Sequence, residues 1–247
     1  RVLHLSSERT WRGGEQQMAY LIEESAKLGV ENFVAVREGS AFEKYCKEQQ
    51  ILFISLGFKN EFHLPTVLGI KSFCKKNAID IVHMHSSHSH ALGVLSQVMG
   101  NDAKLVLSRK VDFPVKKNFA SKFKFNYKGI DAIICVSNAI KDILFPDIKR
   151  TEILKVAYDG ISLDRFKNSK NNHILHDEFT LDSSQKIVAN ISAVADHKDY
   201  FTFVDTAELI LKARKDITFF IIGDGPLFLE IQAYIKSKGL DCLLYTS

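Results

Sequence analysis

Short, almost uninterrupted apolar runs recur along the chain, and they constrain its fold more than any other feature. In the N-terminal part they occupy residues 2–5, 33–36, 51–56, 79–85, 104–109, 132–137 and 152–160. Segments in which apolar residues recur at helical spacing separate these runs. Runs without polar alternation indicate strands that are buried on both faces. The pattern predicts an α/β fold, in which helices flank a parallel sheet.

The clearest predicted helix follows the first run. Its apolar residues share one face at helical spacing: Met18, Leu21, Ile22 and Ala26. Gly29 is the expected end of this helix. Gly13 and Gly14 stand at its beginning, where glycines let backbone N–H groups approach an anion such as phosphate. A tight turn without a ligand is the alternative interpretation.

A change of composition divides the chain. Between Leu163 and Gln185 the sequence is polar and rich in Asn, Asp and Ser, which is typical of a join between domains. The α/β pattern then restarts with runs at 186–193 and 217–225 and predicted helices at 199–214 and about 226–238. We therefore expect a first domain at 1–163, a linker at 164–185 and a second, similar but incomplete domain at 186–247.

Composition excludes several classes of protein. The 247 residues can bury one large core or two modest ones, and a net charge of +4 does not indicate any particular partner. No segment approaches the apolar length of a membrane span. The four cysteines of the chain are scattered, without metal-ligand spacing or a dense disulfide pattern: Cys46, Cys74, Cys135 and Cys242. They predict the reduced, mostly buried cysteines of a cytoplasmic protein.

Histidines cluster around the run at 79–85. His83 and His85 are expected on the same side of a strand, near its carboxyl end, where open α/β sheets bind ligands. A histidine there can act as an acid or base, or can form a hydrogen bond with a polar substrate. Because no acidic or cysteine ligand is near, we predict no metal site. His88 and His90 are expected on the following turn or helix, as solvated neighbours.

Two further candidate sites follow strands of the restarted pattern. Lys198 stands between a predicted strand and helix, where it could neutralise a diphosphate or be an ordinary surface lysine. Gly223 and Gly225 follow the run at 217–222, and Pro226 suits the first position of the next helix. This turn could be a ligand loop or could simply end a strand.

A basic and aromatic segment occupies residues 115–128. Its lysines are Lys116, Lys117, Lys122, Lys124 and Lys128, and its aromatic residues are Phe119, Phe123, Phe125 and Tyr127. Such a composition is found where proteins bind anionic membranes or nucleic acid. The interpretation favoured by the sequence is a helix with its phenylalanines facing inward and its lysines facing outward.

Six motifs follow one another along the chain: WRGGEQQM, DIVHMH, VSNAIKD, VAYDGISLDRF, DHKDYFTFVDTAELI and FFIIGDGP. Taken in order, they resemble retaining glycosyltransferases of family 4, which have the GT-B architecture, and the resemblance runs from residue 1 to about 240. It implies two Rossmann-like domains. The first would mainly hold a glycan or lipid-linked acceptor, and the second a nucleotide-sugar donor, in surface polysaccharide or glycolipid synthesis.

The resemblance also implies roles for individual residues. His85, or less favourably His83, would lie beside the reacting sugar. The donor-binding residues would be Gly13, Gly14, Lys198, Gly223 and Gly225, without a metal or other cofactor. The acceptor or membrane side would hold Arg109, Lys116, Lys117 and Lys122, and the protein would lie in the cytoplasm or at the inner face of the membrane. Nucleic acid is not an expected partner.

The sequence departs from the family pattern at three places. Asp159 stands where asparagine is commoner, and an arginine that often precedes the lysine is missing before Lys198. The paired-glutamate segment that holds the donor sugar is also absent from these 247 residues. We therefore expect an incomplete, inactive fragment. The alternative functions are a non-catalytic binding protein for nucleotide sugars or glycans and a GT-B nucleotide-sugar epimerase.

Overall fold

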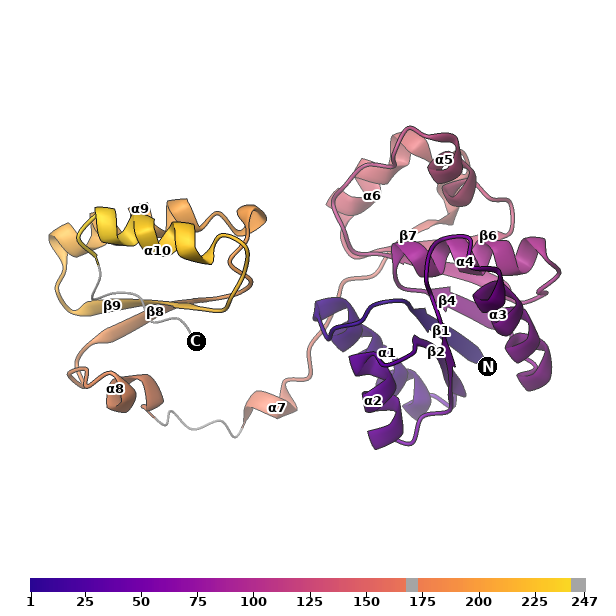
Figure 1. Cartoon of the computed structure of the whole chain (residues 1–247), viewed down its shortest axis with the longest axis horizontal. Coiled ribbons are helices and arrows are strands. Elements are labelled where there is room, and N and C mark those ends of the chain that lie inside the picture. The colour runs from indigo at the N-terminus through magenta and orange to yellow at the C-terminus, as the bar shows by residue number, and fades with distance from the viewer. Residues whose placement is uncertain (168–172, 241–247) are drawn as a thin grey trace. The chain divides into compact units, whose positions relative to one another are not determined.

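The computed structural model describes residues 1–167 and 173–240, and it divides into two compact units (Figure 1). Unit 1 comprises Arg1–Lys167 and unit 2 comprises Asn168–Ser247. The segment that the sequence predicts as a linker, 164–185, contains the short helices α7 (Asp164–Lys167) and α8 (Ile174–Glu178).

Unit 1 is built on a parallel sheet, as predicted. Its strands are β1 (Val2–Ser6), β2 (Asn32–Arg37), β3 (Phe53–Leu56), β4 (Ile81–Met84), β5 (Lys104–Arg109), β6 (Ile130–Cys135) and β7 (Leu154–Val156). They lie in the order β3-β2-β1-β4-β5-β6-β7, and every neighbouring pair is parallel. Each predicted run overlaps a strand. The largest difference is at 152–160, where only three residues pair with β6 and the rest leaves the sheet.

Helices cover both faces of this sheet. They are α1 (Gly13–Lys27), α2 (Ala41–Glu48), α3 (Leu64–Asn77), α4 (Ser87–Val98), α5 (Phe119–Phe125) and α6 (Asn138–Leu144). In β2, Phe33 and Ala35 join the core beneath α3 and α4, whereas Val34 and Val36 pack against α1 and α2. Figure 1 shows these two pairs of helices on opposite sides of the sheet. This arrangement explains why the strands read as continuous apolar runs.

The strand order reverses between β1 and β4. The chain builds outward from β1 to β3 and then returns to the other side of β1 with β4. A crevice forms at the carboxyl ends of the strands where such a reversal occurs, because the connecting segments diverge to opposite faces. Helix α1 ends as predicted, with Gly29 in the left-handed region at φ +82°.

Unit 2 contains a two-stranded parallel sheet in its described part. Strands β8 (Lys186–Ile191) and β9 (Ile217–Ile222) pair along their whole length, and helices α9 (Tyr200–Ala213) and α10 (Phe228–Ser237) cover one face. Helix α10 begins at Phe228, so the placement of Pro226 at the first helical position was wrong: proline lies two residues earlier, in the preceding turn.

The described cysteines are buried, as the sequence predicts. Cys46, Cys74 and Cys135 are free and buried, whereas Cys242 lies outside the described residues. Burial raises the pKa of the Cys46 and Cys74 thiols to about 12. Among the described helices, none has the length and apolar character needed to cross a bilayer.

Candidate functional site

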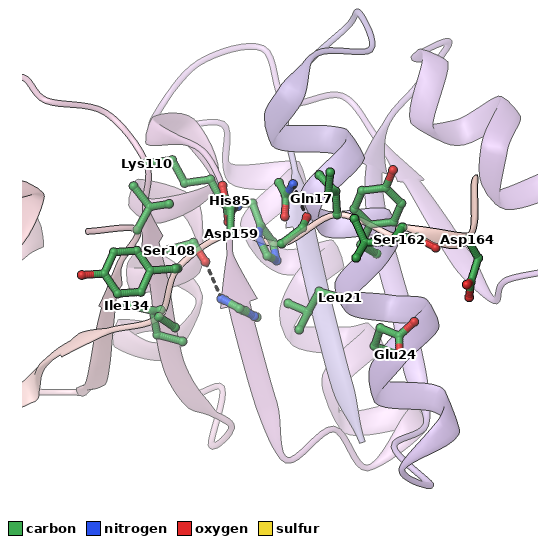
Figure 2. A pocket seen from close by; sticks show the side chains of 18 of the residues that line it. Gln17, Leu21, Glu24, His85, Ser108, Lys110, Ile134, Asp159, Ser162 and Asp164 are labelled. Carbon is green, nitrogen blue, oxygen red and sulfur yellow. Dashed lines mark hydrogen bonds and ion pairs between the residues drawn. The ribbon is translucent and has the colours of Figure 1, made fainter. Parts of the chain in front are cut away.

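A cavity of about 670 Å³ lies at the carboxyl ends of strands β4 to β7, beside helix α1 (Figure 2). His83 and His85 reach it from β4, and Ser108 and Lys110 reach it from the end of β5. Helix α1 and the loop that follows β7 form the remaining walls, which include Gln17, Leu21, Asp159 and Ser162. The cavity therefore occupies the crevice that the reversal of strand order creates.

Three histidines cluster at this site: His83 and His85 line the cavity, and His4 contacts both of them. His4 of β1 pairs in register with His83 of β4, and the rings of His83 and His85 lie 4.1 Å apart between centroids. His4 Nδ1 is 3.1 Å from His85 Nε2, and His4 Nε2 is 3.0 Å from Asn32 Oδ1. His83 Nε2 lies 2.8 Å from the Ser108 hydroxyl. Parallel pairing thus unites residues that are about eighty positions apart in the sequence.

The three imidazoles are neutral at neutral pH. Burial lowers the pKa of His4 to about 4, and it lowers the pKa of His83 to about 3 and that of His85 well below its ordinary value. Neighbouring imidazolium charge and the Lys110 ammonium add to the effect at His83 and His85. Neutral imidazoles donate at one nitrogen and accept at the other, so they suit hydrogen bonding to a polar ligand.

Two interactions hold the loop after β7 over the cavity. Lys110 Nζ forms an ion pair of 2.6 Å with Asp159, and Gln17 Nε2 donates to the Gly160 carbonyl at 2.8 Å. Asp159 is the residue that departs from the asparagine of the family pattern, and here its carboxylate balances the charge of Lys110. Figure 2 shows Lys110 and Asp159 together on one side of the cavity.

The two glycines of the predicted anion loop lie at the first two positions of α1 and do not line the cavity. A Cβ added to Gly13 or Gly14 would meet nothing within 4 Å. Neither glycine has the positive φ that would require glycine. The first amides of a helix have no intrahelical partner, so this end of the 15-residue α1 presents N–H groups to open space.

The other predicted donor-binding residues lie in unit 2. Lys198 is exposed at the end of a 3-10 turn (Asp196–Lys198) directly before α9. Gly223, at φ +146°, and Gly225 lie in a tight turn after β9. A Cβ at Gly223 would lie 2.1 Å from the Ser192 carbonyl oxygen, and one at Gly225 would lie 2.3 Å from that of Val194. Close packing of the turn against the segment after β8 therefore explains both glycines.

The basic and aromatic segment departs only in part from the favoured interpretation of inward phenylalanines and outward lysines, because Phe125 is buried as expected. Phe119 and Phe123 of α5 are 85% and 45% exposed, and their rings stack at 6.4 Å. Lys124 is buried instead, because it forms an ion pair of 2.9 Å with Glu61 and a hydrogen bond with Ser87. The other lysines of the segment are exposed: Lys116, Lys117, Lys122 and Lys128.

Arg109 is the last residue of β5. Its guanidinium donates to the Phe113 carbonyl and lies 5.6 Å from the centre of the Phe125 ring. Burial lowers its pKa, and its buried Nε has no hydrogen-bond partner in the part of the chain that the structure describes. Arg109 is thus half-buried and supports the loop at 110–115.

Sequence reasoning missed several residues of the site. His4, Asn32, Ser108 and Lys110 carry no recognisable motif, although a histidine inside the apolar run 2–5 is a signal that could have indicated His4. The expectation that His90 is solvated was wrong. His90 lies in α4 with 1% exposure, forms a 2.9 Å hydrogen bond with the Lys124 carbonyl, and packs on Phe125.

Comparison with known proteins extends these observations. The family model described as Glycosyltransferase Family 4 matches residues 11–165, more than half of the chain. An Escherichia coli relative named UDP-Gal:alpha-D-GlcNAc-diphosphoundecaprenol alpha-1,3-galactosyltransferase is 22% identical over 180 residues, which are 68% of this chain and 46% of the relative. The GPI3 subunit of phosphatidylinositol N-acetylglucosaminyltransferase from Saccharomyces cerevisiae is 24% identical over 198 residues, covering 73% and 42%. The chain thus spans less than half the length of these curated relatives.

Solved structures with a similar fold cover the whole chain. A glycosyltransferase from Rickettsia africae has a TM-score of 0.83 at 20% identity, with 100% of this chain and 67% of that chain aligned. Anabaena Alr3699/HepE in complex with UDP has a TM-score of 0.82 at 15% identity, with 100% and 68% aligned. At these identities the likeness establishes the fold.

Proposed function

The chain belongs to glycosyltransferase family 4 and has the GT-B type of fold, and on this basis we propose that the protein transfers a sugar from a nucleotide-sugar donor to an acceptor. The observation that carries the proposal is the cavity at the carboxyl ends of β4 to β7. It combines neutral histidines, a serine hydroxyl and a paired lysine in one cavity. Such groups form hydrogen bonds with the hydroxyls of a sugar.

We propose two groups for binding the donor, one in unit 1 and one in unit 2. The N-terminus of α1 at Gly13 and Gly14 offers backbone N–H groups and the positive end of a helix dipole, and Lys198 offers an exposed ammonium. Negative charge grows on the diphosphate as the glycosidic bond breaks, so groups of this kind stabilise the transition state more than the ground state. This scheme requires no metal, and transfer retains the anomeric configuration of the donor, as the family resemblance implies.

For the acceptor we propose a lipid-linked glycan that is reached from an anionic membrane surface. Exposed Phe119 and Phe123 can enter the boundary of a bilayer, while Lys116, Lys117 and Lys122 can bind acidic headgroups. The names of both curated relatives contain a lipid, diphosphoundecaprenol in one and phosphatidylinositol in the other. The protein would then act in surface polysaccharide or glycolipid synthesis.

A transfer assay tests the enzyme proposal. The protein at its natural length would be incubated with a panel of labelled nucleotide sugars, with and without a diphosphoundecaprenol-linked glycan. We expect label in the lipid fraction together with release of nucleoside diphosphate, and both should depend on the acceptor. Binding of a donor without turnover would favour a binding protein. An epimerised nucleotide sugar formed without acceptor would favour an epimerase. Proton NMR of the product would then give its anomeric configuration.

Liposome sedimentation tests the membrane part separately. Binding should increase with the fraction of anionic lipid, and the triple variant K116E/K117E/K122E should lose most of it because each surface lysine contributes about 1 kcal/mol near such a membrane. The control is K75E/K76E, which reverses two exposed lysines on α3. Sedimentation that is independent of anionic lipid would contradict the membrane proposal and leave the transfer proposal standing.

A further inference from the structure

The hydrogen bonds around Asn32 determine which atoms donate and which accept in a series of side-chain hydrogen bonds that leads through His4 to His85. Asn32 Nδ2 lies 3.2 Å from the Ile22 carbonyl and 3.0 Å from the Val30 carbonyl, so the amide nitrogen must face these two acceptors. Its Oδ1 then faces the Ser25 hydroxyl at 3.1 Å and His4 Nε2 at 3.0 Å. Because the amide oxygen only accepts hydrogen bonds, the hydrogen of the neutral His4 ring must be on Nε2.

The position of the hydrogen on His4 in turn determines the position of the hydrogen on His85. With hydrogen on Nε2, His4 Nδ1 carries a lone pair, and it lies 3.1 Å from His85 Nε2. His85 Nε2 must therefore carry the hydrogen and donate it. In a neutral ring the other nitrogen, His85 Nδ1, is then an acceptor, and this buried atom has no hydrogen-bond partner among the described residues.

We propose that Asn32 and His4 are positioning residues that hold His85 in the tautomer with hydrogen on Nε2, so that Nδ1 can accept a hydrogen bond only from a donor group of the ligand. This rests on the proposed function for its ligand, because His85 lines the cavity assigned to the sugar. A hydroxyl fits such an acceptor. A phosphate or carboxylate oxygen does not, because two lone pairs would face each other.

A metal ion is the competing explanation for the cluster. The candidate ligand atoms of His4, His83 and His85 lie within 4.8 Å of one another, and among the described residues no other group of three such side chains converges in this way. An ion between His4 and His85 would have to displace their shared hydrogen. The nearby Lys110 ammonium disfavours positive charge at His83 and His85, so it also disfavours a metal ion there. Both observations favour the series of hydrogen bonds from Asn32 through His4 to His85 over a metal site.

Nitrogen NMR of the ligand-free chain, labelled with 15N-histidine, tests this series of hydrogen bonds without any assumption about function. At neutral pH the wild-type spectrum should show His85 with a protonated Nε2 and an unprotonated Nδ1. A through-hydrogen-bond coupling should join His85 Nε2–H to His4 Nδ1. In H4L, which removes the acceptor of the His85 Nε2 hydrogen, His85 should no longer be held with its hydrogen on Nε2. S25A removes the hydroxyl that contacts Asn32 Oδ1 and the Ile22 carbonyl, and it should leave the tautomer of His85 unchanged. A proton on His85 Nδ1 in the wild type would overturn the proposal.

Two further measurements complete the test. Titration of the chain with one equivalent of Zn²⁺ should leave the ring resonances of the three histidines unchanged, and a joint shift would assign the cluster to a metal instead. In the protein at its natural length, H4L should weaken binding of the donor or acceptor sugar about three- to tenfold, which corresponds to one hydrogen bond, while S25A should not. If the tautomer changes in H4L but affinity for both sugars stays at the wild-type value, Nδ1 is not a ligand contact and the proposal fails.

Discussion

Loss of one buried histidine should make the protein measurably less sensitive to acid. His90 is 1% exposed, and burial followed by the nearby Lys124 charge lowers its pKa to about 3. The unfolded chain has a histidine pKa of about 6.5, so between pH 6.5 and 3 only the unfolded state binds this proton. The free energy of unfolding then falls with decreasing pH by about 1.4 kcal/mol per unit, which is about 2 kcal/mol at pH 5.

Urea unfolding at pH 7 and pH 5 measures this effect. Trp11, the only tryptophan of the chain, stacks on Phe42 in unit 1 and reports the unit that contains His90. In H90Q the difference in unfolding free energy between the two pH values should be smaller than in the wild type by about 2 kcal/mol. The matched control is H88Q, which changes an exposed residue of the same helix. An equal difference in H90Q and the wild type, with unchanged m-values, would refute the reasoning.

Three further outcomes are expected. G223A should destabilise unit 2 by about 1–3 kcal/mol, because its Cβ would lie 2.1 Å from the Ser192 carbonyl oxygen at φ +146°; faster hydrogen exchange in β8 and β9, absent in G13A, would show it. K198A should weaken binding of a nucleoside diphosphate by about tenfold or more, measured by calorimetry on the protein at its natural length; an unchanged Kd would make Lys198 an ordinary surface residue. Transfer should persist after EDTA treatment, and its loss with recovery on adding Mg²⁺ or Zn²⁺ would contradict a metal-free mechanism.

The apolar runs predicted the strands well because these strands are buried on both faces. In β2 all four central residues, 33–36, are buried although alternate side chains point to opposite helical layers. The run at 152–160 misled at its end. Residues 157–160 follow β7 as an exposed loop that lines the cavity, with Tyr158 70% exposed, so the apolar residues at 157 and 158 do not continue the strand.

The site was only partly accessible to sequence reasoning. His83 and His85 were found because they are two residues apart at the end of one apolar run; His83 lies in β4 and His85 directly after it, and their rings lie 4.1 Å apart on the same side. His4 and Asn32 were missed because only the register of β1 against its two neighbours brings them to His85. No local pattern contains that register, since it depends on pairings across about eighty residues.

The basic and aromatic segment shows a different limit. Composition alone could not decide which side chains face the core, and helix α5 is only seven residues long. Phe119 and Phe123 are four residues apart and so share an exposed face, whereas Lys124 is buried by a partner at Glu61, far away in the sequence. The partner of a buried charge is a tertiary property, which explains the wrong expectation.

The most direct test of the account separates catalysis from binding at His85. In the protein at its natural length, H85A should lower the rate of sugar transfer by at least about a hundredfold, as expected when a group at the reacting sugar is removed. Its affinity for the nucleoside diphosphate should change little, and H88A, an exposed neighbour, should behave as the wild type. A wild-type transfer rate in H85A would contradict the claim that the histidine-lined cavity is where the sugar is transferred.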